Sequence, residues 1–255
     1  MSFDLHHSKN VFIFGAGHGI GLSLVINLVK NFSHINVYCS YRTKEKASEL
    51  FELKKKYNDR IFIFQVNPTE ESELKVISDQ LLKNELKFDL VINCIGMLHT
   101  AQFNPEKSIK QFSLEYSMEL FKVNTMVTPL LLKYFEHLLN KNTVNVFTTL
   151  SAKVGSIDDN HLGGWYSYRA SKAALNMILK TAAIEFKRKK NKCIVLAIHP
   201  GTTETELSKP FIKNTNYKIH SPDETAKNII DNVIMNLSES DSGKFLSWDG
   251  EEIPW

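Results

Sequence analysis

Near its N-terminus the chain reads Val11-Phe12-Ile13-Phe14-Gly15-Ala16-Gly17-His18-Gly19-Ile20-Gly21, four apolar residues followed by closely spaced glycines. An apolar pattern at helical spacing continues through Leu22, Val25, Ile26 and Val29. A short strand, a glycine turn and an amphipathic helix are typical of the start of a βαβ unit. Glycines in such a turn let the backbone approach a pyrophosphate at the helix N-terminus. A purely structural turn could use the same glycines, but this position favours nucleotide binding.

Strands and helices are expected to alternate along the rest of the chain. Further strands are predicted at residues 35–40, 61–66, 90–94, 144–149, 193–198 and 245–248. Helices are predicted at 45–57, 70–82, 114–139, 168–189 and 221–237, the last with Ser221 as N-cap and Pro222 at its first position. Strands that are apolar throughout and alternate with helices indicate a parallel sheet covered on both faces. We therefore expect an α/β fold, and the chain shows no composition shift that would divide residues 1–255 into two domains.

Composition excludes several classes of function. The chain has 255 residues, of which 43% are hydrophobic and 23% charged, and its formal net charge is +3. That charge is too small to argue for a nucleic-acid or membrane-surface partner. The dense basic run Lys187-Arg188-Lys189-Lys190 falls where a helix is expected to end, and we interpret it as a solvated complement to the helix dipole.

The chain also lacks the features of a secreted or membrane protein. Residues 1–10 are polar and are interpreted as a flexible tail without a signal-peptide apolar region. No apolar run approaches the length of a membrane span. Cys39, Cys94 and Cys193 lie in apolar segments without metal-ligand spacing, which favours reduced core cysteines and no metal site. Cytoplasmic residence is the expectation.

The end of the second strand indicates which dinucleotide is bound. An acidic residue there would select NAD(H), whereas an arginine would pair with the 2′-phosphate of NADP(H). The chain reads Cys39-Ser40-Tyr41-Arg42, and the first acid afterwards is Glu45. Arg42 therefore favours NADP(H), with His18 as an additional donor, unless Arg42 is only a surface residue.

A tyrosine and a lysine stand four residues apart in Tyr168-Arg169-Ala170-Ser171-Lys172. On a helix, Tyr168 and Lys172 lie on the same face. An ammonium beside a phenol favours the phenolate and lowers the phenol pKa, which makes tyrosine a usable acid and base. Alone the pair is weak evidence, because this spacing occurs often on solvated helices.

Several motifs in order resemble the short-chain dehydrogenase/reductase family over nearly the whole chain. They are the glycine turn at Gly15, Gly19 and Gly21, then Asn93-Cys94-Ile95-Gly96, Asn124, Tyr168-x-x-x-Lys172 and Pro200-Gly201. Within that family the chain looks most similar to the C-factor type and the sniffer-type carbonyl reductases. The similarity rests on Gly155-Ser156-Ile157, Gly163 to Lys172, His199-Pro200-Gly201-Thr202, and Gly243-Lys244-Phe245 through Trp248-Asp249-Gly250 to Trp255.

The resemblance implies a single Rossmann-type domain, a doubly wound parallel sheet of about seven strands, that transfers hydride between a nicotinamide and a carbonyl or alcohol carbon. Tyr168 would protonate the nascent alkoxide, and Lys172 would tune it and hold the nicotinamide ribose. Asn124 would hold a proton-relay water, or its amide would fill a helix kink. The implied cofactor contacts are Gly15, Gly17, His18, Gly19, Ile20, Gly21, Arg42, Asn67, Asn93, Gly96, Tyr168, Lys172, Pro200, Gly201 and Thr202.

Three positions depart from the family pattern. Ala152 stands where the family places its catalytic serine, so Ser151 is expected to take that role, with Ser156 as the alternative. Losing an oxyanion donor would slow the reaction without abolishing it. Cys94 replaces an asparagine and is expected to pack. Asn67 replaces an aspartate that contacts the adenine, and it can still accept a hydrogen bond.

Substrate and partners are less defined. The segments 156–165 and 202–218 would line the substrate pocket, with Trp165, Leu207 and Phe211 as an apolar wall and His161 as a polar contact. The leading hypothesis is an NADPH-dependent reductase acting on an aldehyde or ketone. The alternative is an NAD(P)-binding signalling or regulatory protein of C-factor type with little turnover. Both a homo-oligomer and a monomer remain open.

Overall fold

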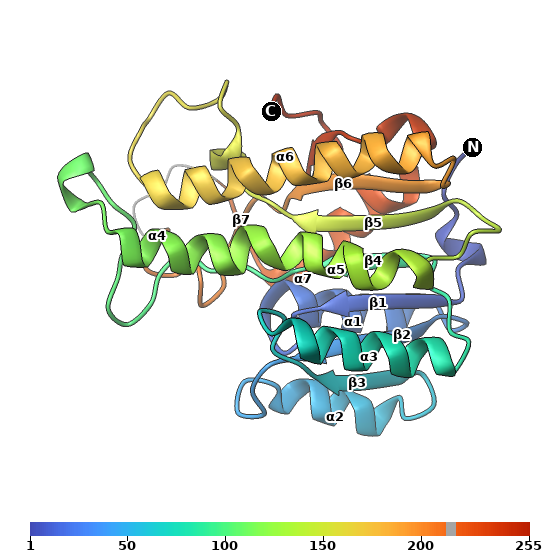
Figure 1. Ribbon diagram of the computed structural model, residues 1–255. Helices are drawn as coiled ribbons and strands as arrows, with labels where there is room; N and C mark the ends of the chain where they lie inside the picture. The colour runs from blue at the N-terminus through green and yellow to red at the C-terminus, as the bar shows by residue number, and fades with distance from the viewer. Residues whose placement is uncertain (213–217) are drawn as a thin grey trace.

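The computed structural model describes residues 1–212 and 218–255. One sheet of seven parallel strands runs through the molecule in the order β3-β2-β1-β4-β5-β6-β9 (Figure 1). The strands are β1 (Asn10–Phe14), β2 (Asn36–Tyr41), β3 (Ile61–Gln65), β4 (Leu90–Asn93), β5 (Asn145–Leu150), β6 (Cys193–His199) and β9 (Phe245–Ser247). Chain order reverses between β1 and β4, which is where ligands bind in open α/β sheets. The expected doubly wound sheet is confirmed.

Helices cover both faces of the sheet. One apolar cluster joins the sheet to α1 (Gly19–Asn31), α2 (Ser48–Lys56) and α7 (Pro222–Asn228). The other joins it to α3 (Glu71–Lys83), α5 (Val127–Phe135) and α6 (Tyr166–Arg188), which cross the front of the sheet in Figure 1. Both faces of the sheet are covered, so most strand residues are buried. This explains why the strand sequences are apolar throughout and do not alternate with polar residues.

Two helices are less regular than the sequence predicts. The segment expected as one helix over 114–139 consists of α4 (Leu114–Leu120), a π-helical turn (Phe121–Met126), α5 and a short 3₁₀ turn. The predicted N-cap of α7 is confirmed, since Ser221 and Glu224 form a capping box with Pro222 at the first position. Beyond Asn228, however, that helix continues as a π turn and a 3₁₀ turn. An apolar period near 3.6 does not distinguish these variants from a regular α-helix.

Residues 1–10, which were expected to form a flexible tail, pack against the rest of the fold. Phe3 and Leu5 are buried in the same apolar cluster as α1, and the Phe3 amide donates to the Leu237 carbonyl at 2.9 Å. Asp4 caps a 3₁₀ turn over Leu5–His7, and β1 begins at Asn10. Two isolated apolar residues in a polar segment gave too weak a pattern to predict burial, although burial of such side chains is favourable.

Long connections gather at the edge of the sheet where the strands end. The loops after β4 and β5 protrude there, on the left of Figure 1, and the segment after β6 joins them through β7 (Thr202–Thr203) and β8 (Ile219–His220). Residues 213–217, part of the loop expected to flank the pocket, lie outside the described residues. None of the helices in the described part of the chain is long and apolar enough to cross a membrane.

Candidate active site

The glycine turn between β1 and α1 forms an open cradle. Gly15 and Gly19 adopt left-handed φ angles of 75° and 59°, which side chains rarely adopt. A Cβ at Gly21 would lie 2.3 Å from the Gly15 carbonyl oxygen, so only glycine fits where helix and strand meet. His18 precedes α1 without capping it, which leaves the first N–H groups of the helix available to an anion. These features fit the pyrophosphate of a dinucleotide.

Basic side chains lie beside this cradle at the end of β2. Arg42 follows β2 and is exposed, and Lys46 pairs with Glu206 at 2.5 Å. His18 lies close to both cations: burial is the main factor that lowers its pKa, Glu206 opposes this, and Lys46 and Arg42 lower it further. Arg42 is thus one of several cations at this edge.

Two other expected cofactor contacts have structural partners. Asn93 is buried at the end of β4, where its Nδ2 donates to Thr128 and its Oδ1 accepts from the Ile95 amide at 3.0 Å. It therefore shapes the turn that leads to Gly96. Asn67 accepts from the amide and the hydroxyl of Thr69, so its oxygen is engaged in a local turn.

The predicted residues of the reaction centre converge from three elements. Asn124 lies in the π-helical turn, where its side chain bonds both backbone groups of Met97 and donates to Ser171 on α6. A Cβ built on Gly96 would lie 3.7 Å from Asn124 Oδ1 and 3.7 Å from Lys172 Nζ. The kink that Asn124 occupies is therefore tied to the loop after β4 and to the helix that carries Lys172.

Tyr168 and Lys172 lie on the buried face of α6. Tyr168 is 7% exposed and Lys172 is 3% exposed. The Lys172 ammonium donates to the Leu150 carbonyl at the end of β5 at 2.9 Å and lies 6.0 Å from the centre of the Tyr168 ring. The predicted pair is thus close together at the ends of β4 and β5.

The Tyr168 pKa is raised, and not lowered as expected from the neighbouring ammonium. Burial raises the pKa of the phenol, and the same burial lowers the pKa of Lys172 to about 8. Removing a charge from water penalises the phenolate and the ammonium alike. Tyr168 is therefore held protonated, as a proton donor, at neutral pH.

The serine expected to replace the missing hydroxyl at Ala152 has a different partner. Ser151 is buried and donates to Asn176 Oδ1 at 2.6 Å, whereas Ala152 packs in the apolar cluster that contains Tyr168. Successive residues after a strand point to opposite sides, which explains the difference. Ser156 is also buried, and its hydroxyl accepts from the Asp159 amide. In this structure the Ser151 hydroxyl is engaged by Asn176.

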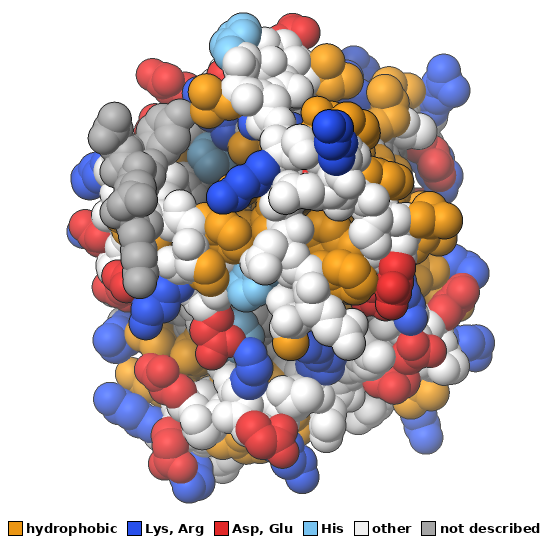
Figure 2. Space-filling model, turned by 90° about the vertical axis from the view of Figure 1, so that its left-hand side faces the viewer, with side chains coloured by type: hydrophobic (Ala, Val, Ile, Leu, Met, Phe, Trp, Pro, Cys, Tyr) orange, Lys and Arg blue, Asp and Glu red, His pale blue; other side chains and the backbone are white. Residues whose placement is uncertain are grey.

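An apolar cluster surrounds Tyr168. Trp165 meets the Tyr168 ring edge-on at 6.1 Å between centroids and meets Phe211 at 5.5 Å. The buried members of this cluster are Leu98, Tyr116, Leu120 and Tyr168, with Met97, Phe103, Ala152, Val154, Trp165, Leu207 and Phe211 packed against them. The charged side chains of Lys172 and Glu106 lie next to it, on the Tyr168 ring and on Ser167. Figure 2 views this side of the molecule, where hydrophobic side chains gather between basic and histidine side chains. His161 is exposed outside the cluster, so its expected pocket contact is not observed.

The remaining predicted contacts follow β6. Gly201 has φ 78°, and a Cβ there would lie 2.8 Å from Trp248, so the turn after Pro200 requires glycine. Thr202 begins β7, and the same segment brings Thr205 to the glycine turn, with its methyl group 3.6 Å from the Cβ position of Gly19. Ile20 belongs to the first turn of α1 and packs on the core.

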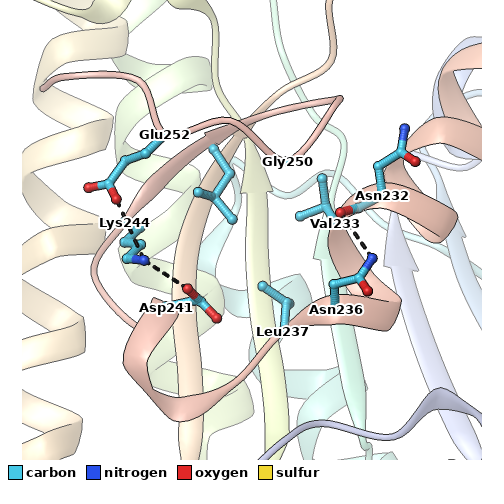
Figure 3. Close-up of a pocket in the computed structure, with 9 residues that line it drawn as sticks. Asn232, Val233, Asn236, Leu237, Asp241, Lys244, Gly250 and Glu252 are labelled. Atoms are coloured by element: carbon cyan, nitrogen blue, oxygen red, sulfur yellow. Dashed lines mark hydrogen bonds and ion pairs between the residues drawn. The ribbon is translucent and has the colours of Figure 1, made fainter.

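A separate cavity lies between the end of the α7 region and the C-terminal tail (Figure 3). The ammonium of Lys244, which lines this cavity, forms ion pairs with Asp241 at 2.9 Å and with Glu252 at 3.5 Å. The lining residues do not include Tyr168, Lys172 or the glycine turn. This cavity is therefore not the candidate active site.

Two charged residues near Tyr168 were missed by sequence reasoning. Glu106 is 1% exposed and its carboxylate accepts from the amide and hydroxyl of Ser167. Arg169 donates to three loop carbonyl groups. A buried acid 61 residues from its partner leaves no local pattern, and Arg169 reads as an ordinary exposed helix residue.

The fold and this site define the class of protein. A parallel sheet of this order, a glycine cradle at its first helix and a buried Tyr–Lys pair fit an oxidoreductase that binds a dinucleotide. The family profile for short chain dehydrogenases matches residues 9–216. The chain belongs to this family of oxidoreductases.

Individual relatives agree with that assignment. The 1-hydroxy-2-glutathionyl-2-methyl-3-butene dehydrogenase of Rhodococcus sp. (strain AD45) is 30% identical over 195 residues, which cover 74% of this chain and 78% of the relative. The carbonyl reductase Sniffer of D. melanogaster shares the fold with a TM-score of 0.85 and 22% identity, over 98% of this chain and 100% of that one. A short-chain dehydrogenase/reductase from Burkholderia multivorans with bound NADP has a TM-score of 0.81 and 21% identity, over 97% and 100%.

Proposed function

We propose that the chain reduces an uncharged aldehyde or ketone to an alcohol with NADPH, and that Tyr168 donates the proton. The observation that carries this proposal is the buried phenol of Tyr168, which lies beside Lys172 in an apolar cluster on the short chain dehydrogenase fold. Bound NADPH supplies the hydride. As the carbonyl oxygen gains negative charge, the Tyr168 hydroxyl hydrogen-bonds to it and then transfers its proton.

Lys172 has two tasks in this proposal. At neutral pH the Lys172 side chain is charged in most molecules, because its pKa of about 8 lies above 7. The ammonium stabilises the phenolate that remains after proton transfer, and it would also hydrogen-bond the cofactor ribose. Asn124 fixes the loop at Met97 against α6 and so keeps Gly96 open beside Lys172.

The cluster around Tyr168 supports an uncharged substrate with an aromatic or bulky aliphatic group. Trp165 and Phe211 present aromatic rings, and burying a charged substrate among them would carry a large desolvation penalty. The similarity to a carbonyl reductase is consistent with this class. We expect turnover of aromatic ketones and aldehydes, and at least tenfold lower kcat/KM, about 1.4 kcal/mol, for analogues that carry a carboxylate near the carbonyl.

The test is NADPH consumption with such matched pairs of substrates. Reduction of the uncharged member, with the charged analogue at least about tenfold poorer, supports the proposal. Binding of NADPH without turnover on any carbonyl would instead support a second candidate, a dinucleotide-binding regulatory protein. Ala152 favours that candidate, because a hydroxyl is missing where the oxyanion would form and Ser151 is bonded to Asn176.

Preference for NADPH over NADH is proposed from Arg42. Arg42 follows β2 and is exposed, and together with Lys46 it adds to the burial that lowers the pKa of His18 in the glycine turn. A guanidinium pairs with a phosphate, and an aspartate there would repel it and attract a ribose hydroxyl. Arg42→Asp should shift the NADPH/NADH ratio of kcat/KM toward NADH by at least tenfold, about 1.4 kcal/mol. Arg188→Asp, at the exposed end of α6, is the matched control; an unchanged ratio in Arg42→Asp would refute the role.

A further inference from the structure

The turn that leads into α6 has an unusual backbone. Gly163, Gly164 and Trp165 have φ angles of 63°, 67° and 53°, three consecutive residues in the left-handed region. Glycine adopts this region freely, whereas a bulky residue such as Trp165 does so only where its surroundings hold it. Tyr168 lies three residues further on, so the direction of its phenol depends on how this turn is held.

Glu106 holds the turn from the loop after β4. Its backbone carbonyl accepts from the Trp165 amide at 2.5 Å, and its carboxylate accepts from the Ser167 amide at 3.2 Å and from the Ser167 hydroxyl. Trp165 offers no side-chain cap to the helix. Within the described chain Glu106 forms no ion pair, so its buried charge is balanced by these donors and by the N-terminal dipole of the 23-residue helix.

Arg169 holds the same turn from the helix side. Its guanidinium donates to the Gly164 carbonyl at 3.0 Å, to the Gly163 carbonyl at 3.2 Å and to the Val154 carbonyl at 3.3 Å. The last bond reaches the loop that follows β5. Gly164 lies against the Glu106 backbone: a Cβ there would be 3.5 Å from the Glu106 carbonyl oxygen, an ordinary contact distance, so it is the φ of 67° that favours glycine at this position.

We propose that Glu106 and Arg169 are positioning residues that clamp the left-handed turn and thereby aim Tyr168 and the Trp165 ring at the substrate. The inference rests on the proposed function of Tyr168. Glu106 acts through Ser167, the residue directly before Tyr168, and it links the substrate loop after β4 to the helix that carries the reactive phenol.

The first test compares Glu106→Ala, Glu106→Gln and the exposed control Glu119→Gln. Loss of the clamp should lower kcat of Glu106→Ala about 100-fold, the usual cost of a misplacement near 1 Å. The NADPH dissociation constant should change by less than about twofold, because the glycine cradle is untouched. Glutamine can accept from the Ser167 amide and donate to its hydroxyl, so Glu106→Gln should retain kcat within about tenfold.

The second test reads the turn directly by hydrogen exchange of the peptide that covers residues 163–172. Glu106→Ala and Ser167→Ala should both exchange faster there, while Glu119→Gln matches the wild type. The proposal would be overturned if hydrogen exchange were unchanged in both variants. It would also be overturned if Glu106→Gln lost as much kcat as Glu106→Ala and both losses were matched by weaker NADPH binding. If the wild type reduces no carbonyl, the proposed function fails, and the exchange measurement still decides whether Glu106 holds the turn.

Discussion

Burial shifts the pKa values of the two reactive side chains in opposite directions, and it favours the protonated phenol of Tyr168. The Tyr168 pKa is raised and the Lys172 pKa is lowered to about 8. Reduction needs a protonated phenol and a charged ammonium at the same time. That combination exists below about pH 8, where Lys172 still carries its proton.

The rate of carbonyl reduction should therefore fall at alkaline pH. We expect kcat to stay level from pH 6 to 7 and to decline above about 8 as Lys172 loses its charge. The pH profile of NADPH oxidation at saturating substrate measures this. A rate that stays constant to pH 10 would show that the charge of Lys172 does not support the chemistry.

The same shift links Lys172 to stability. Its pKa is lower in the folded chain than its ordinary value of 10.5, so the unfolded chain binds the proton more tightly between about pH 8 and 10.5. Burying the charged lysine destabilises the fold in full below about pH 8, and this cost is relieved as the pH rises through the window. Lys172→Met should remove this component of the pH dependence of the free energy of unfolding.

Ala152 is the position where one hydroxyl should increase the rate. Ala152 packs against the apolar cluster that contains Tyr168, whereas Ser151 donates to Asn176. We expect Ala152→Ser to raise kcat about tenfold, since a donor to the developing oxyanion is worth at least that much where it is well aligned.

Ser151→Ala should lower the free energy of unfolding by about 1–3 kcal/mol and change kcat little, because it leaves Asn176 Oδ1 without its donor. A large kcat loss in Ser151→Ala with normal stability would reverse this assignment.

At the scale of elements, the site depends on how closely α6 approaches the loop after β5. A Cβ on Gly155 would lie 2.7 Å from the Cβ of Lys172 and 3.0 Å from its carbonyl carbon. Gly155→Ala must therefore push α6 away, which should cost about 1–3 kcal/mol of stability and lower kcat through displacement of Lys172. Urea unfolding and turnover measure the two effects. Full stability and activity in this variant would contradict the packing described here.

Local patterns predicted the regular elements well, for physical reasons. The glycine turn and the Tyr168–Lys172 spacing depend on neighbouring residues, so a short sequence window contains them. The π-helical turn at Phe121–Met126 and the orientation of Ser151 depend on what packs against them. Glu106 is the clearest case, because its partner Ser167 is 61 residues away and the carboxylate is buried only by the fold.

At the scale of the whole molecule, the N-terminal segment contributes to the core on the side away from the site. Leu5 is buried in the apolar cluster that also contains α1. Figure 1 shows the N-terminus on the right, at the end of the sheet where the strands begin, and the loops after β4 and β5 on the left, where the strands end. Leu5→Ala should lower the free energy of unfolding by about 2–5 kcal/mol and leave kcat unchanged. Lys9→Ala, with an exposed side chain, serves as the control. Equal stability of Leu5→Ala and Lys9→Ala would restore the expectation of a flexible tail.

The central claim is that this molecule reduces a carbonyl through the Tyr168 hydroxyl. Tyr168→Phe removes one oxygen from a buried ring and leaves the apolar cluster and the glycine cradle in place. Without its proton donor we expect kcat to fall at least about 100-fold, with the NADPH dissociation constant nearly unchanged. The decisive measurement is single-turnover NADPH oxidation by wild type and Tyr168→Phe with the best uncharged ketone. A rate in Tyr168→Phe equal to that of the wild type would contradict the account.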